Sequence, residues 1–314
     1  MKIAIVGAGR MGSLIGSYLS KGGEDVILLD PWQAHVDAIN KDGLWLENEG
    51  EESFISHPRA YTSADQVGEI VDLLVVLVMG MYTESATRAC LCLCDSHTRC
   101  LSLQNGVGNV QVLAKMFDKE RLMYGFMPYG GTVLGPGRVL ARAGKNAPSH
   151  FGPVGFEEPD KFMEDLAALL RKQGLDFHAD KRSYIDSEVW YKIGMNCCGN
   201  SITAIARLPL GPVFNCDDIT PYLDGIYNEV VAVAAALGIT VAHERSGEKM
   251  PENHEMYNHL SSTAQDVKAK KQTEIDNLCG AVARMGDELG VPTPYNHFAC
   301  GLIKLIQANY DKMF

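Results

Sequence analysis

The sequence predicts an α/β domain with a doubly wound parallel sheet, followed by an all-helical domain. Short β-rich runs alternate with amphipathic segments in the first half of the chain, which is typical of parallel strands joined by crossover helices. A glycine-rich turn directly follows the first run. After about residue 183 the strand-like runs stop and long helical patterns begin, so we expect domains at 1–182 and 183–314.

Short apolar runs and amphipathic patterns place the elements of the first domain. The buried strands are expected at Ile3–Val6, Val26–Leu29, Leu73–Val78 and Cys100–Leu103. The helices between them are expected near Met11–Lys21, Gln33–Asn40 and Thr83–Cys94. Gly135-Pro136-Gly137 predicts a turn between antiparallel strands at the sheet edge.

The second domain is predicted to be helical throughout. Its helices are expected at Tyr184–Ala206, Pro221–Leu237, Ala264–Leu289 and Tyr295–Tyr310. Proline-containing breaks separate them at Leu208–Pro212 and Val291–Pro294.

Composition limits the function. The 314 residues suit two domains, and the 46% apolar and 21% charged content is that of a globular protein. A net charge of −11 argues against a nucleic-acid partner, because such binding neutralises phosphates with Lys and Arg. The start of the chain does not resemble a signal peptide, and the longest apolar stretch, Leu73–Met79, is too short to span a membrane. We therefore expect a cytoplasmic protein without a membrane partner.

Nine cysteines raise the question of a metal site. Cys90, Cys92 and Cys94 alternate with leucines, and His97 and Cys100 follow. Alternate spacing puts the three thiols on different faces of a helix, no CxxC pair is present, and adjacent cysteines such as Cys197-Cys198 chelate poorly. We expect free thiols and no metal.

The glycine-rich turn has the G-x-G-x-x-G pattern. The first glycine permits a tight turn, the second lets the backbone approach a pyrophosphate, and the third lets the following helix pack closely on the strand. Because the motif lies between a buried strand and a helix, it predicts a Rossmann-type dinucleotide site. The residues expected to bind the cofactor there are Gly7, Ala8, Gly9, Arg10, Met11 and Gly12.

Asp30 ends the second predicted strand, where a carboxylate binds the adenosine ribose 2′-hydroxyl and repels a 2′-phosphate. No arginine follows closely, so NAD(P)H is the expected cofactor with NADH favoured over NADPH. Alternatively, Asp30 is the N-cap of a helix that begins at Pro31-Trp32. Asp30 could cap the helix and bind the ribose at the same time.

Polar residues in the helical half suggest chemistry. Lys192, Asn196 and Asn200 are spaced i, i+4, i+8, so they line one helix face over about 12 Å. The alternative is an ordinary solvent face, although such a face usually carries more charge. Ser262, Asp266 and Glu274 follow later, and the residues alone favour a solvent-facing charge over a catalytic role for Glu274.

Six motifs in order resemble the 2-dehydropantoate 2-reductase (ketopantoate reductase) family over essentially the whole chain. They are MKIAIVGAGRMGS at the start, Ala34-His35 followed by Gly43-Leu44, QNGVG at 104–108, GPGRV at 135–139, WYKIGMNCCGNSITAI at 190–205 and SSTAQDVKAKKQTEID at 261–276. The resemblance implies reduction of a branched 2-keto acid in pantothenate biosynthesis, by hydride transfer from NAD(P)H.

The resemblance also implies roles for individual residues. Lys192 would be the proton donor to the keto oxygen, with a pKa lowered by burial, and Glu274 its partner carboxylate. Asn196, Asn200 and Ser262 would bind the substrate's hydroxyl and carboxylate groups, supported by Asp266. Asn105 would lie beside the nicotinamide and the keto acid, at the carboxyl end of a sheet strand.

Two departures concern the substrate and the cofactor. Met79 stands where family members usually carry a lysine, and Asp30-Pro31 stands where NADPH-using members carry an arginine. The second feature is similar to the NAD-dependent D-2-hydroxyacid (D-mandelate-type) dehydrogenase branch, which handles bulkier 2-keto acids. The residues that would suit a larger apolar pocket, although each is more often plain core, are Met79, Met81, Met127 and Tyr129.

Three classes of function therefore compete. The leading one is a 2-keto acid reductase, whose substrate is 2-dehydropantoate or a bulkier acid. A non-catalytic dinucleotide-binding redox sensor is disfavoured because it has no need of Lys192, and a structural helical partner protein is disfavoured by the glycine turn. The sequence leaves the oligomeric state open, with a homodimer through the helical half as one alternative.

Overall fold

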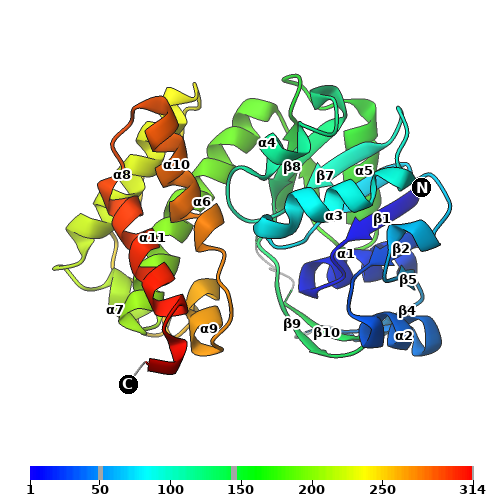
Figure 1. The fold of residues 1–314 in the computed structure, drawn as a ribbon, viewed down its shortest axis with the longest axis horizontal. Coiled ribbons are helices and arrows are strands. Elements are labelled where there is room, and N and C mark those ends of the chain that lie inside the picture. Colours follow the sequence, from blue (N-terminus) through cyan, green and yellow to red (C-terminus); the bar gives the residue numbers. More distant parts are fainter. Residues whose placement is uncertain (49–51, 143–146, 313–314) are drawn as a thin grey trace. The chain divides into compact units, whose positions relative to one another are not determined.

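The computed structural model describes residues 1–48, 52–142 and 147–312 (Figure 1). The chain divides into two compact units, an α/β unit and a helical unit. The α/β unit comprises Met1–Gln104 and Asn109–Ile185, and the helical unit comprises Asn105–Gly108 and Asp186–Phe314. The domain division at 1–182 and 183–314 stays a prediction, and the contacts group the loop Asn105–Gly108 with the helices.

The α/β unit is built on an eight-stranded sheet in the order β12-β11-β8-β7-β6-β1-β2-β5. Its strands are β1 (Lys2–Val6), β2 (Asp25–Leu29), β5 (Arg59–Tyr61), β6 (Leu73–Val76), β7 (Arg99–Ser102), β8 (Leu122–Phe126), β11 (Ser149–Pro153) and β12 (Phe177–Ala179). All neighbours are parallel except β8 and β11. Val6 pairs with Leu29 and with Val76, so β1, β2 and β6 end at the same edge of the sheet.

Four short strands form a second sheet that the sequence patterns did not predict. They are β3 (Leu44–Asn48), β4 (Phe54–Ser56), β9 (Gly130–Gly135) and β10 (Arg138–Arg142), in the order β4-β3-β10-β9. The predicted turn at Gly135-Pro136-Gly137 is confirmed, because β9 and β10 are antiparallel. The edge strand that it forms, β9, belongs to this second sheet.

Helix α1 (Arg10–Lys21) contacts strands of both sheets, so its middle is buried from Gly12 to Leu19. The other helices of this unit are α2 (Gln33–Asp42), α3 (Thr83–Ala89), α4 (Asn109–Leu113) and α5 (Lys161–Lys172). Single 3-10 turns are found at η1 (Ala64–Gln66), η2 (Gly80–Tyr82), η3 (Leu91–Leu93) and η4 (Lys119–Arg121). The predicted helix Thr83–Cys94 is wrong in its second half, because the backbone tightens at Cys90 into η3.

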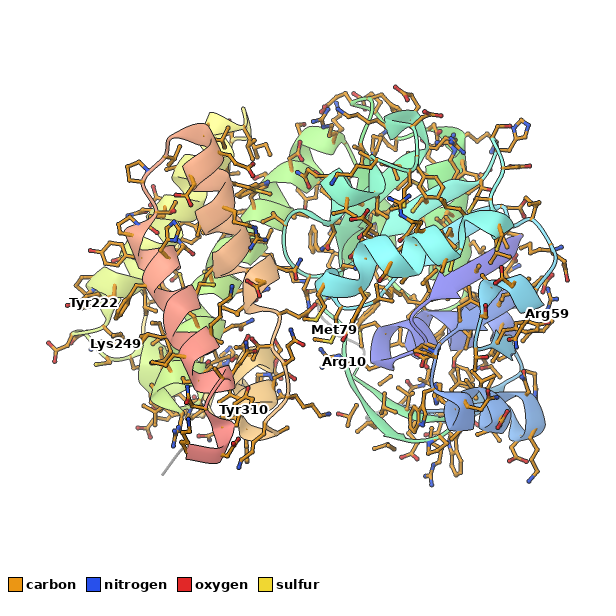
Figure 2. The ribbon with its side chains drawn as sticks, viewed as in Figure 1. Arg10, Arg59, Met79, Tyr222, Lys249 and Tyr310 are labelled. Carbon is orange, nitrogen blue, oxygen red and sulfur yellow. The ribbon has the colours of Figure 1, made fainter. Side chains whose placement is uncertain are left out.

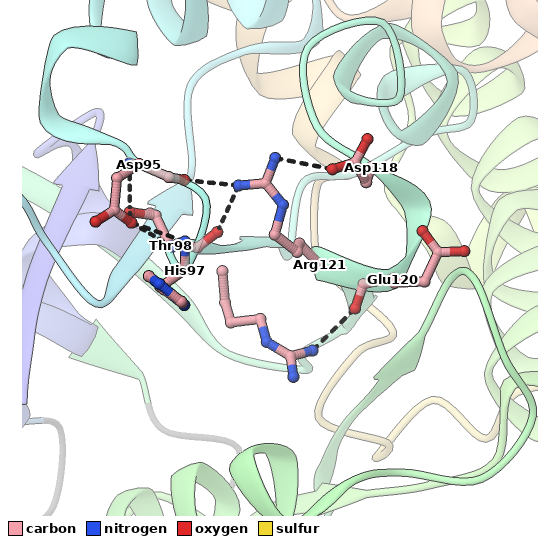
Figure 3. A network of polar contacts seen from close by, with 7 residues as sticks. Asp95, His97, Thr98, Asp118, Glu120 and Arg121 are labelled. Carbon is pink, nitrogen blue, oxygen red and sulfur yellow. Dashed lines mark hydrogen bonds and ion pairs between the residues drawn. The ribbon is translucent and has the colours of Figure 1, made fainter.

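A network of polar contacts lies at the amino-terminal ends of β7 and β8, at the end of the sheet opposite the glycine turn. Figure 3 shows this network from close by. Arg121 donates to the carbonyl oxygen of Asp95 at 2.7 Å and pairs with Asp118 at 3.2 Å. The Asp95 carboxylate accepts the His97 N–H at 2.8 Å. Arg99 donates to the Glu120 carbonyl at 2.9 Å, so the amino-terminal ends of β7 and β8 are held together. The glycine turn and Asp30 lie at the opposite end of the sheet, where β1 and β2 end.

The helical unit packs around α6 (Arg182–Ala206), which begins in the α/β unit. The remaining elements are α7 (Leu210–Phe214), α8 (Thr220–Ala236), α9 (Ser262–Lys268), η5 (Ile275–Asn277), α10 (Cys279–Leu289), α11 (Pro294–Gln307) and η6 (Tyr310–Lys312). The unbroken helix predicted at Ala264–Leu289 is wrong. Lys270 has a left-handed φ of 53°, and the Lys271 N–H donates to the Asp266 carbonyl at 2.9 Å, which ends α9.

Within the described ranges, no helix is both long enough and apolar enough to cross a membrane.

Candidate active site

The three glycines of the first turn are required for different physical reasons. Gly7 has a φ of 95°, which glycine adopts readily. A Cβ on Gly12 would overlap the carbonyl oxygen of Gly7, so only glycine lets α1 start this close to the strand. A Cβ on Gly9 would meet nothing within 4 Å, so the backbone there lies open to a ligand. The turn therefore has the shape that a dinucleotide pyrophosphate needs.

The first turn of α1 suits an anion. Gly9 is the N-cap, no side chain caps it within the described residues, and the first turn contains no acidic residue. The N–H groups of a helix start carry partial positive charge, which favours a phosphate. Arg10 begins the helix and is marked in Figure 2. The six predicted cofactor residues thus form one continuous turn. Its open backbone and partial positive charge fit a dinucleotide pyrophosphate.

Asp30 follows β2 at the same edge of the sheet. Its Oδ1 accepts the Trp32 N–H at 3.0 Å, and its own N–H donates to the Tyr61 carbonyl at 3.2 Å. The alternative role as a helix cap is wrong, because the N-cap of α2 is Trp32 and no side chain caps it. In the part of the chain that is described, Oδ2 of Asp30 accepts no protein hydrogen bond. This carboxylate oxygen is therefore suited to a ribose hydroxyl.

Gln104 fixes the segment that contains Met79. Its Nε2 donates to the carbonyl of Val78 and to the Thr83 hydroxyl, both at 2.8 Å, and its Oε1 accepts from Ser102 at 2.9 Å. Met79, labelled in Figure 2, is the N-cap of η2 and lies three residues after the end of β6. A Cβ on Gly7 would lie 3.0 Å from Val78, so this segment lies against the glycine turn. The positioning role of Gln104 was not predicted, although its QNG motif was noted.

The loop Asn105–Gly108 is part of the helical unit. The Val107 N–H donates to the Asn277 carbonyl at 3.2 Å, and Val107 is buried in the helical core. Gly106 has a φ of 86°, and a Cβ on it would overlap the Asn277 carbonyl oxygen. The contact joins Asn105 to the segment that contains Glu274, three residues before Asn277.

Lys192, Asn196 and Asn200 lie along α6. Lys192 and Asn196 are half-buried and Asn200 is buried, so the alternative of an ordinary solvent face is wrong. Burial lowers the pKa of the Lys192 ammonium to about 8. A lysine with such a pKa can release a proton near neutral pH, as a general acid must.

Asn200 and Ser262 are brought together by packing between α6 and α9. The Asn200 amide donates to the Ser262 hydroxyl at 3.3 Å. Ser261, the N-cap of α9, accepts the Ala264 N–H at 3.2 Å and lies 2.6 Å from the Thr203 hydroxyl. The Thr203 contribution was not predicted, although it lies on the next turn of the same helix. These contacts set the position of Ser262 against α6.

Glu274 lies in the irregular segment between α9 and α10, half-buried, and not on a long helix as predicted. Thr273 is buried, its N–H donates to Gln307 at 2.6 Å, and its hydroxyl accepts the Ile275 N–H at 3.3 Å. The backbone on both sides of Glu274 is therefore fixed. Asp266 is half-buried on α9.

The cysteines are all free thiols, and most of them are buried. Burial raises the pKa of Cys90 to about 12 and that of Cys94 to about 11, whereas Cys92 is exposed. Among residues 1–48, 52–142 and 147–312, no three His, Cys, Asp or Glu side chains are placed to hold a metal ion.

Comparison with known proteins identifies relatives over the full chain. A 2-dehydropantoate 2-reductase of Streptococcus pyogenes serotype M18 is 28% identical, with 98% of each chain covered. That of Lactococcus lactis is 29% identical, with 96% of this chain and 97% of the other covered. The solved PanE/ApbA family ketopantoate reductase of Ralstonia eutropha JMP134 has a TM-score of 0.84 at 28% identity, covering 99% and 100%. A D-mandelate dehydrogenase solved with NADH and anilino(oxo)acetate has a TM-score of 0.86 at 26% identity, also covering 99% and 100%.

Family models cover both halves of the chain. The model described as ketopantoate reductase PanE/ApbA matches residues 3–155, and the model of the C-terminal part of the same family matches residues 184–307. With the glycine turn and the α6 residues in place, the chain is an oxidoreductase that belongs to the ketopantoate reductase PanE/ApbA family.

Proposed function

We propose that the protein reduces a branched 2-keto acid, 2-dehydropantoate or a close analogue, to the 2-hydroxy acid with a nicotinamide cofactor. The observation that carries the proposal is Lys192, an ammonium with a pKa lowered by burial to about 8, on the same helix as Asn196 and Asn200. Reduction of a keto group needs a proton donor at the oxygen, and a lysine of this kind is well suited to that step.

The residues of α6 and its partners have distinct roles in the proposal. Bound NAD(P)H supplies the hydride to the keto carbon. The Lys192 Nζ donates a hydrogen bond to the keto oxygen and transfers its proton as the C=O bond becomes C–OH, which leaves a neutral amine that is reprotonated from solvent. Glu274 orients the ammonium or the substrate.

Substrate binding is assigned to neutral polar groups. Asn196, Asn200 and Ser262 bind the hydroxyl and carboxylate groups of the substrate, with Asp266 in support. The Asn200–Ser262 hydrogen bond of 3.3 Å supports this assignment, because it presents both side chains together. Asn105 acts beside them, on a loop anchored to Asn277.

Cofactor binding is assigned to the glycine turn and Asp30. The open backbone at Gly9 and the uncapped start of α1 accept the pyrophosphate. Asp30 accepts a ribose hydroxyl through Oδ2 and repels a 2′-phosphate, so we expect NADH to bind more tightly than NADPH.

A second candidate is an NAD-dependent D-2-hydroxyacid dehydrogenase that acts on bulkier 2-keto acids. It is favoured by Asp30 and by the likeness to D-mandelate dehydrogenase solved with NADH, at a TM-score of 0.86 and full coverage. Met79 supports it as well, since a thioether in place of a lysine makes the segment after β6 apolar.

Steady-state oxidation of NADH and NADPH with a panel of 2-keto acids tests both candidates. The panel contains 2-dehydropantoate, 2-ketoisovalerate and phenylglyoxylate. Turnover of 2-dehydropantoate supports the first candidate and a place in pantothenate biosynthesis, whereas NADH turnover limited to phenylglyoxylate supports the second. Absence of turnover with every acid, despite measurable cofactor binding, would contradict both and favour a redox sensor. A cytoplasmic homodimer remains part of the proposal, and light scattering of the purified protein tests the dimer.

A further inference from the structure

Trp32 is a large aromatic side chain that stays exposed next to the candidate cofactor site. It is 43% exposed and lies where β2 leads into α2, two residues after Asp30. Indole rings are largely buried in most folded proteins, because they carry a large apolar surface. An exposed indole at this edge of the sheet is therefore available to a ligand.

The Trp32 ring is held in one orientation. It stacks on the His35 imidazole with the ring centres 5.2 Å apart and the planes 5° from parallel. His35 is buried, and its Nδ1 accepts the Gly137 N–H at 3.0 Å. Burial also lowers the pKa of His35, which keeps the imidazole neutral and able to accept. The backbone N–H of Trp32 donates to the Asp30 carboxylate, which fixes the backbone that carries the ring.

The same histidine is close to the glycine turn. The Ser13 hydroxyl donates to the Ala8 carbonyl at 2.7 Å and lies 3.5 Å from the His35 Nε2. Trp32 is thus connected by contacts of His35 and Ser13 to Ala8, in the turn assigned to the pyrophosphate. A ring fixed before binding loses little conformational entropy when a ligand stacks on it.

Trp45 provides a contrast within the same unit. It is 40% exposed, but the Arg138 guanidinium lies 4.4 Å from its ring centre and is paired with Glu47 at 2.5 Å. Trp45 therefore already has a cation over its ring. In the described part of the chain, the ring and cation contacts of Trp32 are with His35 alone.

We propose that the Trp32 indole is the stacking platform for the adenine base of the dinucleotide, with His35 as its positioning residue. The inference rests on the proposed function. Adenine is planar and uncharged, so it stacks on indole without an electrostatic cost. The ribose of the same adenosine would bind the Asp30 carboxylate, so one turn of three residues recognises both parts of an adenosine that lacks a 2′-phosphate.

Calorimetric titration of the full-length protein with ADP-ribose and with NADH tests the platform. Trp32→Ala should raise the Kd of both ligands about tenfold, because base–aromatic stacking typically has an effect of that order. Trp32→Phe keeps a ring and should recover most of the affinity. Trp45→Ala is the matched control, since it removes an equally exposed indole, and it should leave both values unchanged.

Fluorescence gives a second measurement that does not depend on the stability of Trp32→Ala. Of the three tryptophans, Trp190 is buried, so a Trp45→Phe protein has Trp32 as its exposed indole. ADP-ribose should quench this emission and protect it from iodide. Wild-type affinity of Trp32→Ala for ADP-ribose, or full iodide access in the bound state, would overturn the platform while cofactor binding stands. Failure of the wild-type protein to bind NADH, NADPH or ADP-ribose would instead overturn the proposed function.

Discussion

The glycine turn after β1 and the polar group around α6 differ in how their geometry arises. Gly7, Gly9 and Gly12 lie within six residues, and each is explained by contacts of the turn with itself and with adjacent strands. The polar group on the helical side combines α6 with three other segments, at Asn105–Gly108, α9 and η5. Local backbone geometry therefore specifies the first region, whereas tertiary packing specifies the second.

The largest expected effect is that of Lys192→Ala. Removing the proton donor should lower kcat by about 10³- to 10⁴-fold, because a general acid that also stabilises the developing charge has an effect of that order. The Kd of NADH should stay within about twofold, since Lys192 is far from the glycine turn in sequence and role. Stopped-flow turnover and calorimetry measure the two quantities. A variant with wild-type kcat would remove Lys192 from the mechanism.

Gly12→Ala and Gly9→Ala separate packing from ligand approach within the glycine turn. The Gly12 substitution should lower the free energy of unfolding by about 2–4 kcal/mol, because its Cβ overlaps the Gly7 carbonyl oxygen. Gly9→Ala has open space and should unfold at the wild-type temperature, but it should weaken NADH binding about tenfold or more by obstructing the pyrophosphate. Thermal unfolding and calorimetry on the pair measure the two effects. Equal stability of the two variants would show that the turn relaxes around a methyl group.

The pH dependence of reduction tests the state of Lys192. Its pKa is lowered to about 8, so the protonated donor is present below that pH and is lost as the pH rises through it. We expect kcat/KM for reduction to be constant below about pH 8 and to fall about tenfold per unit above it. Lys192→Arg should lower kcat, because a guanidinium does not release its proton, and the residual rate should show no fall above about pH 8. A fall that begins near pH 10 would indicate a lysine with its ordinary pKa.

The smallest effect is expected for Thr203→Val, which touches neither ligand in the proposal. The substitution leaves the Ser261 hydroxyl without its 2.6 Å partner, so the free energy of unfolding should decrease by about 1–2 kcal/mol. Because Ser261 starts α9, we also expect the KM for the keto acid to rise while the Kd of NADH is unchanged. Denaturant unfolding and steady-state kinetics measure these values, with Thr220→Val, a half-buried threonine at the start of α8, as the control. An unchanged KM would show that Ser262 does not need this anchor.

Prediction from the sequence was accurate where the determining contacts are local. The strands at Ile3–Val6 and Val26–Leu29 were placed within one residue, because continuous apolar runs between turns are typical of buried parallel strands. The second sheet was missed, since Trp45 pairs with Arg138 across a long sequence separation that no local pattern reveals. The helix predicted at Ala264–Leu289 was wrong because Lys270 adopts a left-handed conformation that lysine rarely shows.

The sequence by itself determined the alternation of strands and helices, the glycine turn and the spacing of Lys192, Asn196 and Asn200 on one helix. Each of these follows from side-chain periodicity or from the backbone freedom of glycine, which act over a few residues. Only the tertiary structure decided that the Asn105 loop joins the helical unit, that Ser262 meets Asn200, and that burial lowers the pKa of Lys192. Those features depend on which segments, distant in sequence, pack against one another and exclude water, and the fold of the whole chain decides this.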